Sequence, residues 1–330
     1  MSARGQTHRL GREAIHTAWD NALPPRLTIA PGDVVVFDTL DASYGNVARA
    51  VAAEAPAGLD PDLAATIAAG AYPADPAHTR GHPLTGPVAV AGAEPGDTLA
   101  VEIAEIVTAP WGWTGCRPGG IGLLDDEITT GDRFYWDLRD GRTAPFGPGI
   151  RVPLAPFPGV IGVAPAEPGR QPTAPPRNAG GNMDIRQLTA GATLYLPVLV
   201  PGALFSVGDV HAAQGDGEVT GTGIETEATV TLRFDLLKGR SIRQPQFRTA
   251  LDAHAPAGPF YATTGHDPDL REAAREALRG MLDFLMREYG LPRTRAYILA
   301  SACVDLKISQ IVDAPNWTVS AFFPLSVVTG

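Results

Sequence analysis

An alternation of apolar and polar residues from 228 to 236 constrains the fold of this chain more than any other feature. Its five apolar positions are separated by polar ones: Ala228, Val230, Leu232, Phe234 and Leu236. Because successive side chains of an extended chain point to opposite faces, the pattern predicts a strand with one buried face. A shorter alternation covers residues 99–103, and the apolar runs 34–37 and 194–200 predict more fully buried strands.

Glycine and proline divide the sequence into short segments. The 330 residues include 37 glycines and 31 prolines, which favours many turns and short strands over a helical bundle. Pro-Gly pairs at 31–32, 95–96 and 201–202 each precede an apolar run. Proline presets the first central position of a type II turn and glycine accepts the positive φ of the second, so each pair predicts a turn that leads into a strand.

Two helices are expected within this β-rich chain. The longer has an apolar stripe between residues 270 and 286, with Asp267 as the expected N-cap, Pro268 at its first position and Gly290 just after its end. A shorter one is expected over residues 61–69. The fold class is therefore mainly β, with sandwich- or barrel-like lobes and a C-terminal α+β lobe. We expect an N-terminal β lobe (1–145), a central β lobe with the metal and catalytic segment (146–240), and the α+β lobe (241–330).

Charge and cysteine content exclude several functional classes. The formal net charge of −10 leaves no basic footprint for nucleic acid and gives no attraction to an anionic membrane. Two cysteines, Cys116 and Cys303, cannot form a disulfide framework, and no signal peptide or spanning segment is evident. We expect a cytoplasmic protein, and the apolar edges of a β-rich chain make a homo-oligomer plausible.

The densest group of polar residues lies between 208 and 218. In an extended segment, Asp209 and His211 project from the same face, and Gln214, Asp216 and Glu218 follow across a glycine-rich bend. An imidazole beside carboxylates suits a divalent metal ion, and zinc accepts such mixed ligands. The alternative is a solvated acidic turn beside an ordinary histidine.

Two weaker clusters contain further candidates. Residues 178–184 combine amides, paired glycines and Asp184, which suits a loop that approaches a small ligand or, equally, an Asx-rich turn. Asp38 and Asp41 follow a buried strand, where carboxylates also cap turns. The isolated histidines are expected to be structural, and Cys303 is expected to be a buried inert thiol. These histidines are His82, His254 and His266.

These segments resemble the acetamidase/formamidase family. The resemblance is carried by residues 86–88, 92–97, 176–184, 208–218, 264–267, 305–310 and 313–316, and it extends over roughly Ile29 to Val328. The segment Gly-Asp-Val-His-Ala-Ala-Gln-Gly-Asp-Gly-Glu at 208–218 is its most specific part. The resemblance implies hydrolysis of the C–N bond of short amides to a carboxylate and ammonia. It also implies a β-rich fold with an α+β end and a bound metal, commonly zinc, although calcium and manganese also suit oxygen-rich sites.

On this basis we expect Asp209 and His211 to bind the ion, with Asp184 as third ligand and Asp41 as its competitor. Glu218 is the expected general base, with Asp216 next in line. Asn182, or the backbone of Gly180 and Gly181, is expected to stabilise the oxyanion, and Gln214 to orient the amide NH₂ of a small amide substrate.

Three other functions stay open. The same site could hydrolyse a cyclic amide, a lactam. A metal-free hydrolase could use Cys303 or a serine as a covalent nucleophile. A non-catalytic β protein could carry a structural metal or only bind a small ligand.

Overall fold

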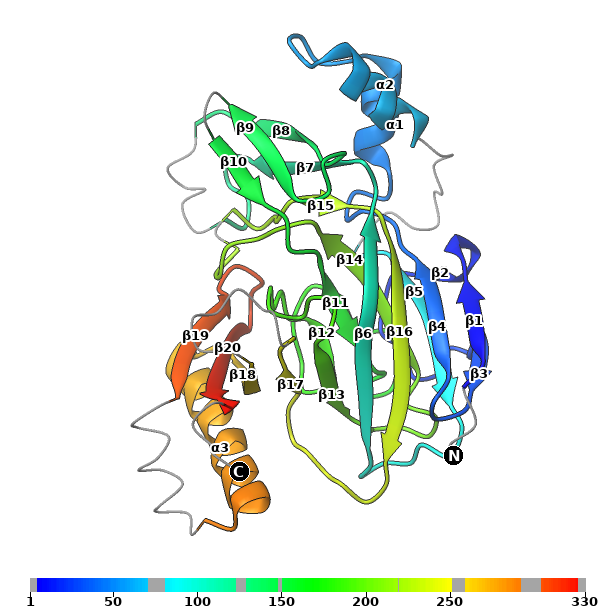
Figure 1. Cartoon of the computed structure of the whole chain (residues 1–330), viewed down its shortest axis with the longest axis vertical. Coiled ribbons are helices and arrows are strands. Elements are labelled where there is room, and N and C mark those ends of the chain that lie inside the picture. The colour runs from blue at the N-terminus through cyan, green and yellow to red at the C-terminus, as the bar shows by residue number, and fades with distance from the viewer. Residues whose placement is uncertain are drawn as a thin grey trace.

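The computed structural model describes residues 5–70, 81–122, 129–147, 150–218, 220–250, 259–291 and 304–325. Two large sheets, mostly antiparallel, dominate this part of the chain (Figure 1). The first contains, in spatial order, β1 (Thr7–Leu10), β4 (Val34–Asp38), β16 (Ala228–Leu237), β6 (Thr98–Thr108), β13 (Thr193–Pro197), β17 (Gln246–Arg248), β18 (Phe260–Asp267), β20 (Trp317–Pro324) and β19 (Asp305–Gln310).

The second sheet carries the segment that the sequence singled out. Its order is β12 (Gly180–Asn182), β11 (Phe157–Gly162), β14 (Phe205–His211), β15 (Glu225–Thr226), β7 (Trp111–Cys116) and β8 (Asp132–Asp137). Strand β5 (Leu84–Val90) also pairs with β14, and with β2 (Ile15–His16) and β3 (Leu27–Ile29). A separate ribbon joins β9 (Thr143–Gly147) to β10 (Ile150–Pro153), and a short 3₁₀ turn covers Arg12–Ala14.

The expected β-rich class is confirmed. The apolar runs at 34–37 and 194–200 form strands, but β4 and most of β13 alternate between buried and half-buried residues instead of being fully buried, and β13 ends at Pro197. Strand β16 alternates between buried and more exposed residues, and β6 extends beyond the predicted alternation as far as Thr108. Glycines 32, 96 and 202 all have positive φ, as the Pro-Gly turns require. The main core lies between the two sheets and includes Phe37, Phe205 and Phe234, whose rings pack against one another.

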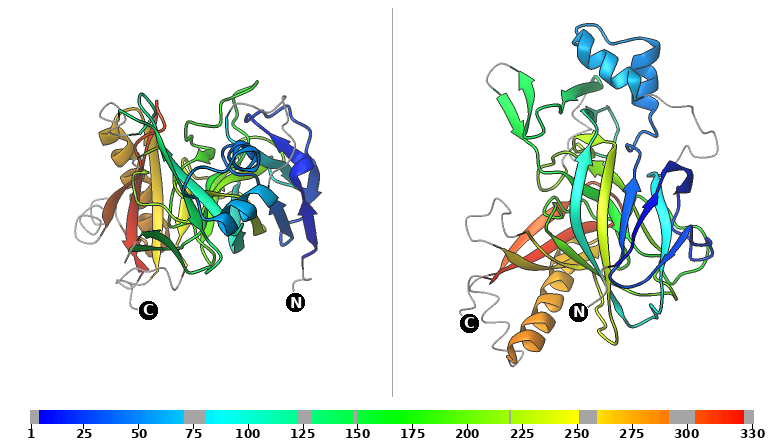
Figure 2. Two further views of the ribbon diagram at one scale, coloured as in Figure 1. Left: turned by 90° about the horizontal axis from the view of Figure 1, so that it is seen from above. Right: turned by 45° about the vertical axis from the view of Figure 1, so that its right-hand side comes forward.

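Helices cover the ends of the molecule (Figure 2). Helices α1 (Asn46–Ala53) and α2 (Pro61–Ala69) pack on Trp111 and Trp113, so both tryptophans belong to a core cluster. Helix α3 (Leu270–Tyr289) packs against β18 and β20. None of the described helices combines the length and apolarity needed to cross a bilayer.

The start of α3 differs from the prediction. Asp267 ends strand β18, and Asp269 is the N-cap, with a side chain that accepts hydrogen bonds from the backbone of Arg271 and Glu272. The sequence placed the cap two residues early because both positions offer a carboxylate, and only the extent of β18 decides between them. Gly290 ends the helix at φ 64°, as predicted.

The first sheet contains strands from all three predicted lobes. It takes β4 and β6 from residues 1–145, β13 and β16 from 146–240, and β17 to β20 from the remainder. The lobe boundaries at 145 and 240 therefore remain predictions. The sheet matters for function because its last hairpin, β19–β20, lies next to the polar segment at 208–218, where Gly217 bridges to Gln310.

Candidate catalytic carboxylate cluster

Strand β14 brings Asp209 and His211 into the interior. All seven of its residues are buried, and β5, β11 and β15 pair with it. Asp209 Oδ1 lies 3.7 Å from His211 Nε2, so the two side chains meet as the spacing suggested. Asp209 has a φ of 53°, in the left-handed region. A non-glycine residue holds that conformation only when its surroundings enforce it, which often happens at functional sites.

The glycine-rich bend returns Glu218 to the same place. Gly217 has a φ of 103° and Glu218 one of 48°, and the Gly217 N–H donates to the Ser309 carbonyl at 3.0 Å. Glu218 is consequently buried although it belongs to a loop. The C-terminal hairpin thus helps to hold this carboxylate in the interior.

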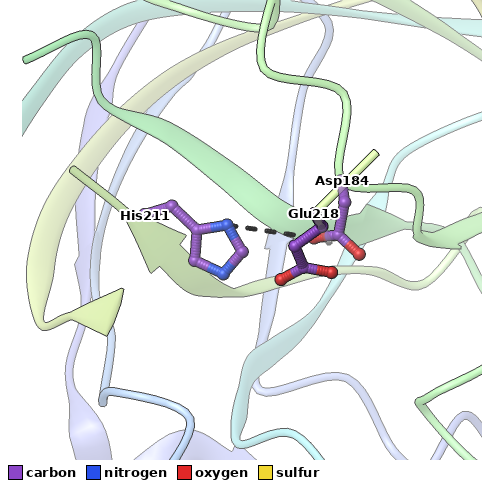
Figure 3. A group of neighbouring side chains, drawn as sticks. All are labelled: Asp184, His211 and Glu218. Carbon is purple, nitrogen blue, oxygen red and sulfur yellow. Dashed lines mark ion pairs between the residues drawn. The ribbon is translucent and has the colours of Figure 1, made fainter. Parts of the chain in front are cut away.

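Two groups of ligand atoms share His211. One consists of Asp184, His211 and Glu218, shown in Figure 3, and the other of Asp209, His211 and Glu225. Within each group the atoms lie no more than 4.8 Å apart. The Nδ1 atom of His211 is 3.9 Å from Asp184 Oδ1, and its Nε2 atom is 3.1 Å from Glu225 Oε1.

Gln214 determines which nitrogen of His211 carries the proton. Its Oε1 atom lies 2.7 Å from His211 Nδ1 and its Nε2 donates to the Asp184 carbonyl at 3.1 Å. Since Oε1 only accepts, Nδ1–H is the donor, and Nε2 faces Asp209 and Glu225. Both ends of the Gln214 amide therefore contact the protein, at His211 and at the Asp184 carbonyl, while its predicted contact with the amide NH₂ of a substrate stays a prediction.

Several buried polar atoms of the cluster have no partner. Within the described part of the chain, no hydrogen bond reaches either carboxylate oxygen of Asp184, Oδ1 of Asp209, Oε2 of Glu225 or Nε2 of His211. Ionised carboxylates only accept hydrogen bonds, so neighbouring carboxylates cannot satisfy one another. Gly159 leaves room for them, because a Cβ there would lie 2.5 Å from Asp184 Oδ1 and 3.1 Å from Asp209 Oδ2. This donor set of carboxylates and one imidazole nitrogen fits a divalent cation.

Burial and mutual repulsion change the proton affinities of these groups. Burial raises the pKa of Glu225 to about 7, and burial together with nearby carboxylates raises the pKa values of Asp184 and Glu218 well above their usual range. Burial by itself would lower the pKa of His211, but the neighbouring Glu225 and Asp209 carboxylates outweigh this effect and raise it. Burial opposes a charged Asp209 too, but His82 and His211 hold its pKa below the usual value. A cation would favour the ionised form of every carboxylate here.

Asn182 and Asp313 form a buried pair beside the cluster. Asn182 Nδ2 donates to Asp313 Oδ2 at 2.7 Å, which fixes the orientation of the Asn182 amide. Its Oδ1 atom is buried and has no hydrogen-bond partner among the residues that the structure describes. Asp313 is positioned by Gln310, whose Oε1 accepts from the Asp313 N–H at 3.0 Å.

Comparison with known proteins identifies the family of this site. The acetamidase/formamidase family model matches residues 5–171 and 166–329. The chain belongs to the acetamidase/formamidase family. It is 27% identical to a formamidase from Methylophilus methylotrophus over 95% of this chain and 89% of the relative. The structure of an acetamidase from Bacillus halodurans matches with a TM-score of 0.80 and 31% identity, and covers 97% of this chain and 98% of the other. The expected resemblance is thereby confirmed.

A further solved structure is similar to the chain over nearly its whole length. A gamma lactamase from Delftia acidovorans is 26% identical with a TM-score of 0.59, over 96% of this chain and 90% of the other.

Two of the carboxylates predicted from the sequence, Asp41 and Asp216, lie outside the buried cluster around His211. Asp41 is buried, but it accepts hydrogen bonds from the Gly45 backbone at 2.7 Å and from Trp113 Nε1 at 2.9 Å, and it is in neither group of ligand atoms. Asp216 is exposed, where Gln187 donates to it at 3.1 Å. Gly180 donates its N–H to the Arg177 carbonyl, so that N–H is not available to an oxyanion.

Three residues of the site were missed. Asp313 lies within a segment that carried the family resemblance, which was the available signal. Glu225 precedes the alternating strand and had no spacing pattern of its own. His82 was interpreted as structural, yet its Nε2 lies 3.9 Å from Asp209 Oδ2. His266 is structural as expected, within hydrogen-bond distance of the Thr264 and Thr318 hydroxyls.

Proposed function

We propose that the protein hydrolyses the C–N bond of short linear amides to a carboxylate and ammonia. The observation that carries this proposal is the buried cluster of carboxylates around His211, with several oxygens unpartnered, in a member of the acetamidase/formamidase family. Relatives named formamidase and acetamidase support linear amides as substrates. A homo-oligomeric state and a cytoplasmic location remain predictions from the sequence.

A divalent ion, with zinc as the first choice, fits the Nε2 side of His211. Asp209, Glu225 and His211 Nε2 would hold it, and Asp184 lies on the Nδ1 side, beside Glu218. When bound, such an ion lowers the pKa of water toward about 7 and polarises a carbonyl oxygen. Calcium and manganese remain alternatives because the ligand set is rich in oxygen.

Glu218 is suited to move the proton. Hydrolysis requires a base that takes a proton from water and an acid that gives one to the departing nitrogen, since ammonia leaves far better than an amide anion. Burial raises the pKa of the Glu218 carboxyl, so this group holds a proton more readily than an exposed glutamate does. Its proximity to Asp184 and His211 places it next to the groups that would surround the reacting atoms.

Asn182 is suited to recognise the amide nitrogen. Asp313 holds its NH₂ group, which leaves the unpartnered Oδ1 to accept a hydrogen bond from a substrate N–H. A buried acceptor without a partner is costly, and a primary amide supplies the missing donor. This reverses the sequence-based roles, in which Gln214 bound the NH₂ group and Asn182 the oxyanion.

The metal-free alternative finds little support among the described residues. Cys303 lies outside them. Ser206 Oγ is 2.8 Å from His16 Nε2, but Ser206 is 1% exposed, and the other ring nitrogen of His16 lies 2.9 Å from the Ala18 carbonyl. This pair has the character of an interior hydrogen bond.

A lactam is the second candidate substrate because of the similarity to the Delftia gamma lactamase. The amide bond of a γ-lactam carries one N–H, so the same groups could hydrolyse it.

Ammonia release from formamide, acetamide and propionamide, with the ring opening of a γ-lactam followed in parallel, tests the proposal. Metal content is measured on the same sample before and after chelation. We expect activity on the linear amides that is lost on chelation and restored by zinc. Activity that survives complete removal of metal would refute the metal-assisted mechanism, and absence of turnover on every amide would refute the proposed function.

The variant Glu218→Gln tests the base. We expect metal content to stay normal and kcat to fall by about 10² to 10⁴, the usual contribution of a positioned acid or base. Asp216→Asn, in the same loop but exposed, serves as comparison and should lose far less. Near-normal activity of Glu218→Gln together with loss in Asp216→Asn would transfer the role to Asp216.

A further inference from the structure

A cavity of about 530 Å³ adjoins the cluster. Gln214 and Glu218 belong to its lining, so it reaches the proposed general base. The remaining lining includes Arg186, Asp216 and three threonines, but most of the exposed wall is apolar and comes from Trp136, Val152, Pro153, Ala155, Ala213 and Ile224. These residues belong to β8, β10, the segment after β10 and the two sides of the 214–223 loop, so the cavity is built by several elements of the fold.

The volume of this cavity exceeds what the smallest amides need. Pockets of about 300–1,000 Å³ bind ligands of drug-like size. Formamide has no carbon beyond its amide group and acetamide has one methyl group. Either would leave most of the apolar wall in contact with water.

The aromatic part of the wall is held rigidly. The Trp136 ring packs against Phe134 at 4.7 Å and against Phe146 at 5.3 Å between centroids. Its Nε1 donates to the Thr114 hydroxyl at 2.9 Å, which fixes the ring plane. A rigid aromatic wall favours flat or branched apolar groups, because binding them costs little ordering of the protein.

We propose that this cavity receives the acyl group of the substrate, and that the preferred substrates are primary amides with a bulky apolar acyl group, such as phenylacetamide. The inference rests on the proposed function, since it places the amide at Glu218, the proposed general base that also lines the cavity, and the acyl group along Trp136 and Ile224. It extends that function by naming the substrate class.

The first test compares kcat/KM for acetamide, butyramide, hexanamide and phenylacetamide on the metal-loaded protein. Burial of each methylene should raise kcat/KM about fourfold, and phenylacetamide should exceed acetamide by at least about tenfold. Flat or falling values beyond acetamide would overturn the inference and leave the proposed function intact.

Ala155→Trp tests the cavity directly, because Ala155 belongs to its lining and a much larger side chain there is expected to take up part of its volume. We expect the ratio of kcat/KM for phenylacetamide to that for acetamide to fall at least tenfold. Val107→Trp is the matched control, at an exposed site on β6 that is not part of the lining, and should leave the ratio unchanged. An unchanged ratio in Ala155→Trp would overturn the inference.

Calorimetric titration with phenylacetamide separates the two proposals. If no amide is hydrolysed, the proposed function fails, yet binding of phenylacetamide that Ala155→Trp abolishes would still support the cavity as an acyl site. Absence of phenylacetamide binding to the wild type would overturn the inference whatever the turnover.

Discussion

Replacement of Gly159 by alanine is the sharpest test of the cluster geometry. Gly159 lies on β11, and its carbonyl accepts hydrogen bonds from the backbone of Met183 and Asp184. Its φ is not in the left-handed region, so alanine can adopt its backbone conformation. The methyl group would, however, lie 2.5 Å from Asp184 Oδ1 and 3.0 Å from the Asp209 carbonyl oxygen.

The magnitude follows from the displacement that this methyl group imposes. Ordinary contact begins near 3.4 Å, so the Asp184 carboxylate must retreat by about 0.9 Å. Misplacement of a reacting group by about 1 Å can cost about 10² in rate, equivalent to about 2.7 kcal/mol of transition-state stabilisation. Overpacking of a buried site costs about 1–3 kcal/mol of folding stability. We therefore expect kcat/KM to fall about a hundredfold while the protein remains folded.

The assay combines kcat/KM for acetamide, metal content and thermal unfolding. Gly115→Ala is the matched control, also a strand glycine without positive φ, whose added methyl group would meet nothing closer than 3.5 Å. We expect this control to match the wild type in all three measurements. If Gly159→Ala keeps more than half of the wild-type kcat/KM with normal metal content, the positions of Asp184 and Asp209 do not govern catalysis, and the reasoning is refuted.

Two further predictions concern other parts of the fold. Asp313→Ala frees the Asn182 amide to rotate. We expect kcat/KM to fall about tenfold, which corresponds to one lost hydrogen bond of about 1.4 kcal/mol, and metal content to stay unchanged. Loss of metal would instead show that Asp313 supports the ion. Burial lowers the pKa of His266 to about 3, whereas the unfolded chain titrates near 6.5. Stability from this residue is therefore present above pH 6.5 and declines as the pH falls toward 3. Denaturant unfolding should show that wild type loses about 2 kcal/mol more than His266→Gln between pH 7 and pH 5, and equal losses would contradict a buried neutral imidazole.

Local sequence patterns specified much of the fold. Alternation located β16, because a strand with one wet face must change polarity at every residue. Glycine at 32, 96 and 202 located the turns, because a positive φ disfavours other residues. The cap of α3 was misplaced because Asp267 and Asp269 are chemically equivalent and the length of β18 depends on its pairing with β20.

The candidate site was only partly accessible in this way. Asp209, His211 and Glu218 are close in sequence, so spacing alone brought them together as candidates. Glu225 and Asp313 escaped notice because Glu225 reaches the cluster from β15 and Asp313 from the connection between β19 and β20, 131 residues from the Asn182 that it orients.

The sequence by itself determined the β-rich class, the turns, the family and the chemical types of side chain available for hydrolysis. The tertiary structure decided which of those side chains meet. Asp41 is occupied by Trp113 and a backbone N–H, Asp216 is exposed, and Gln214 is engaged by His211 and the Asp184 carbonyl. The physical reason is that the role of a carboxylate or an amide depends on its partners and its burial, and both are set by segments distant in sequence.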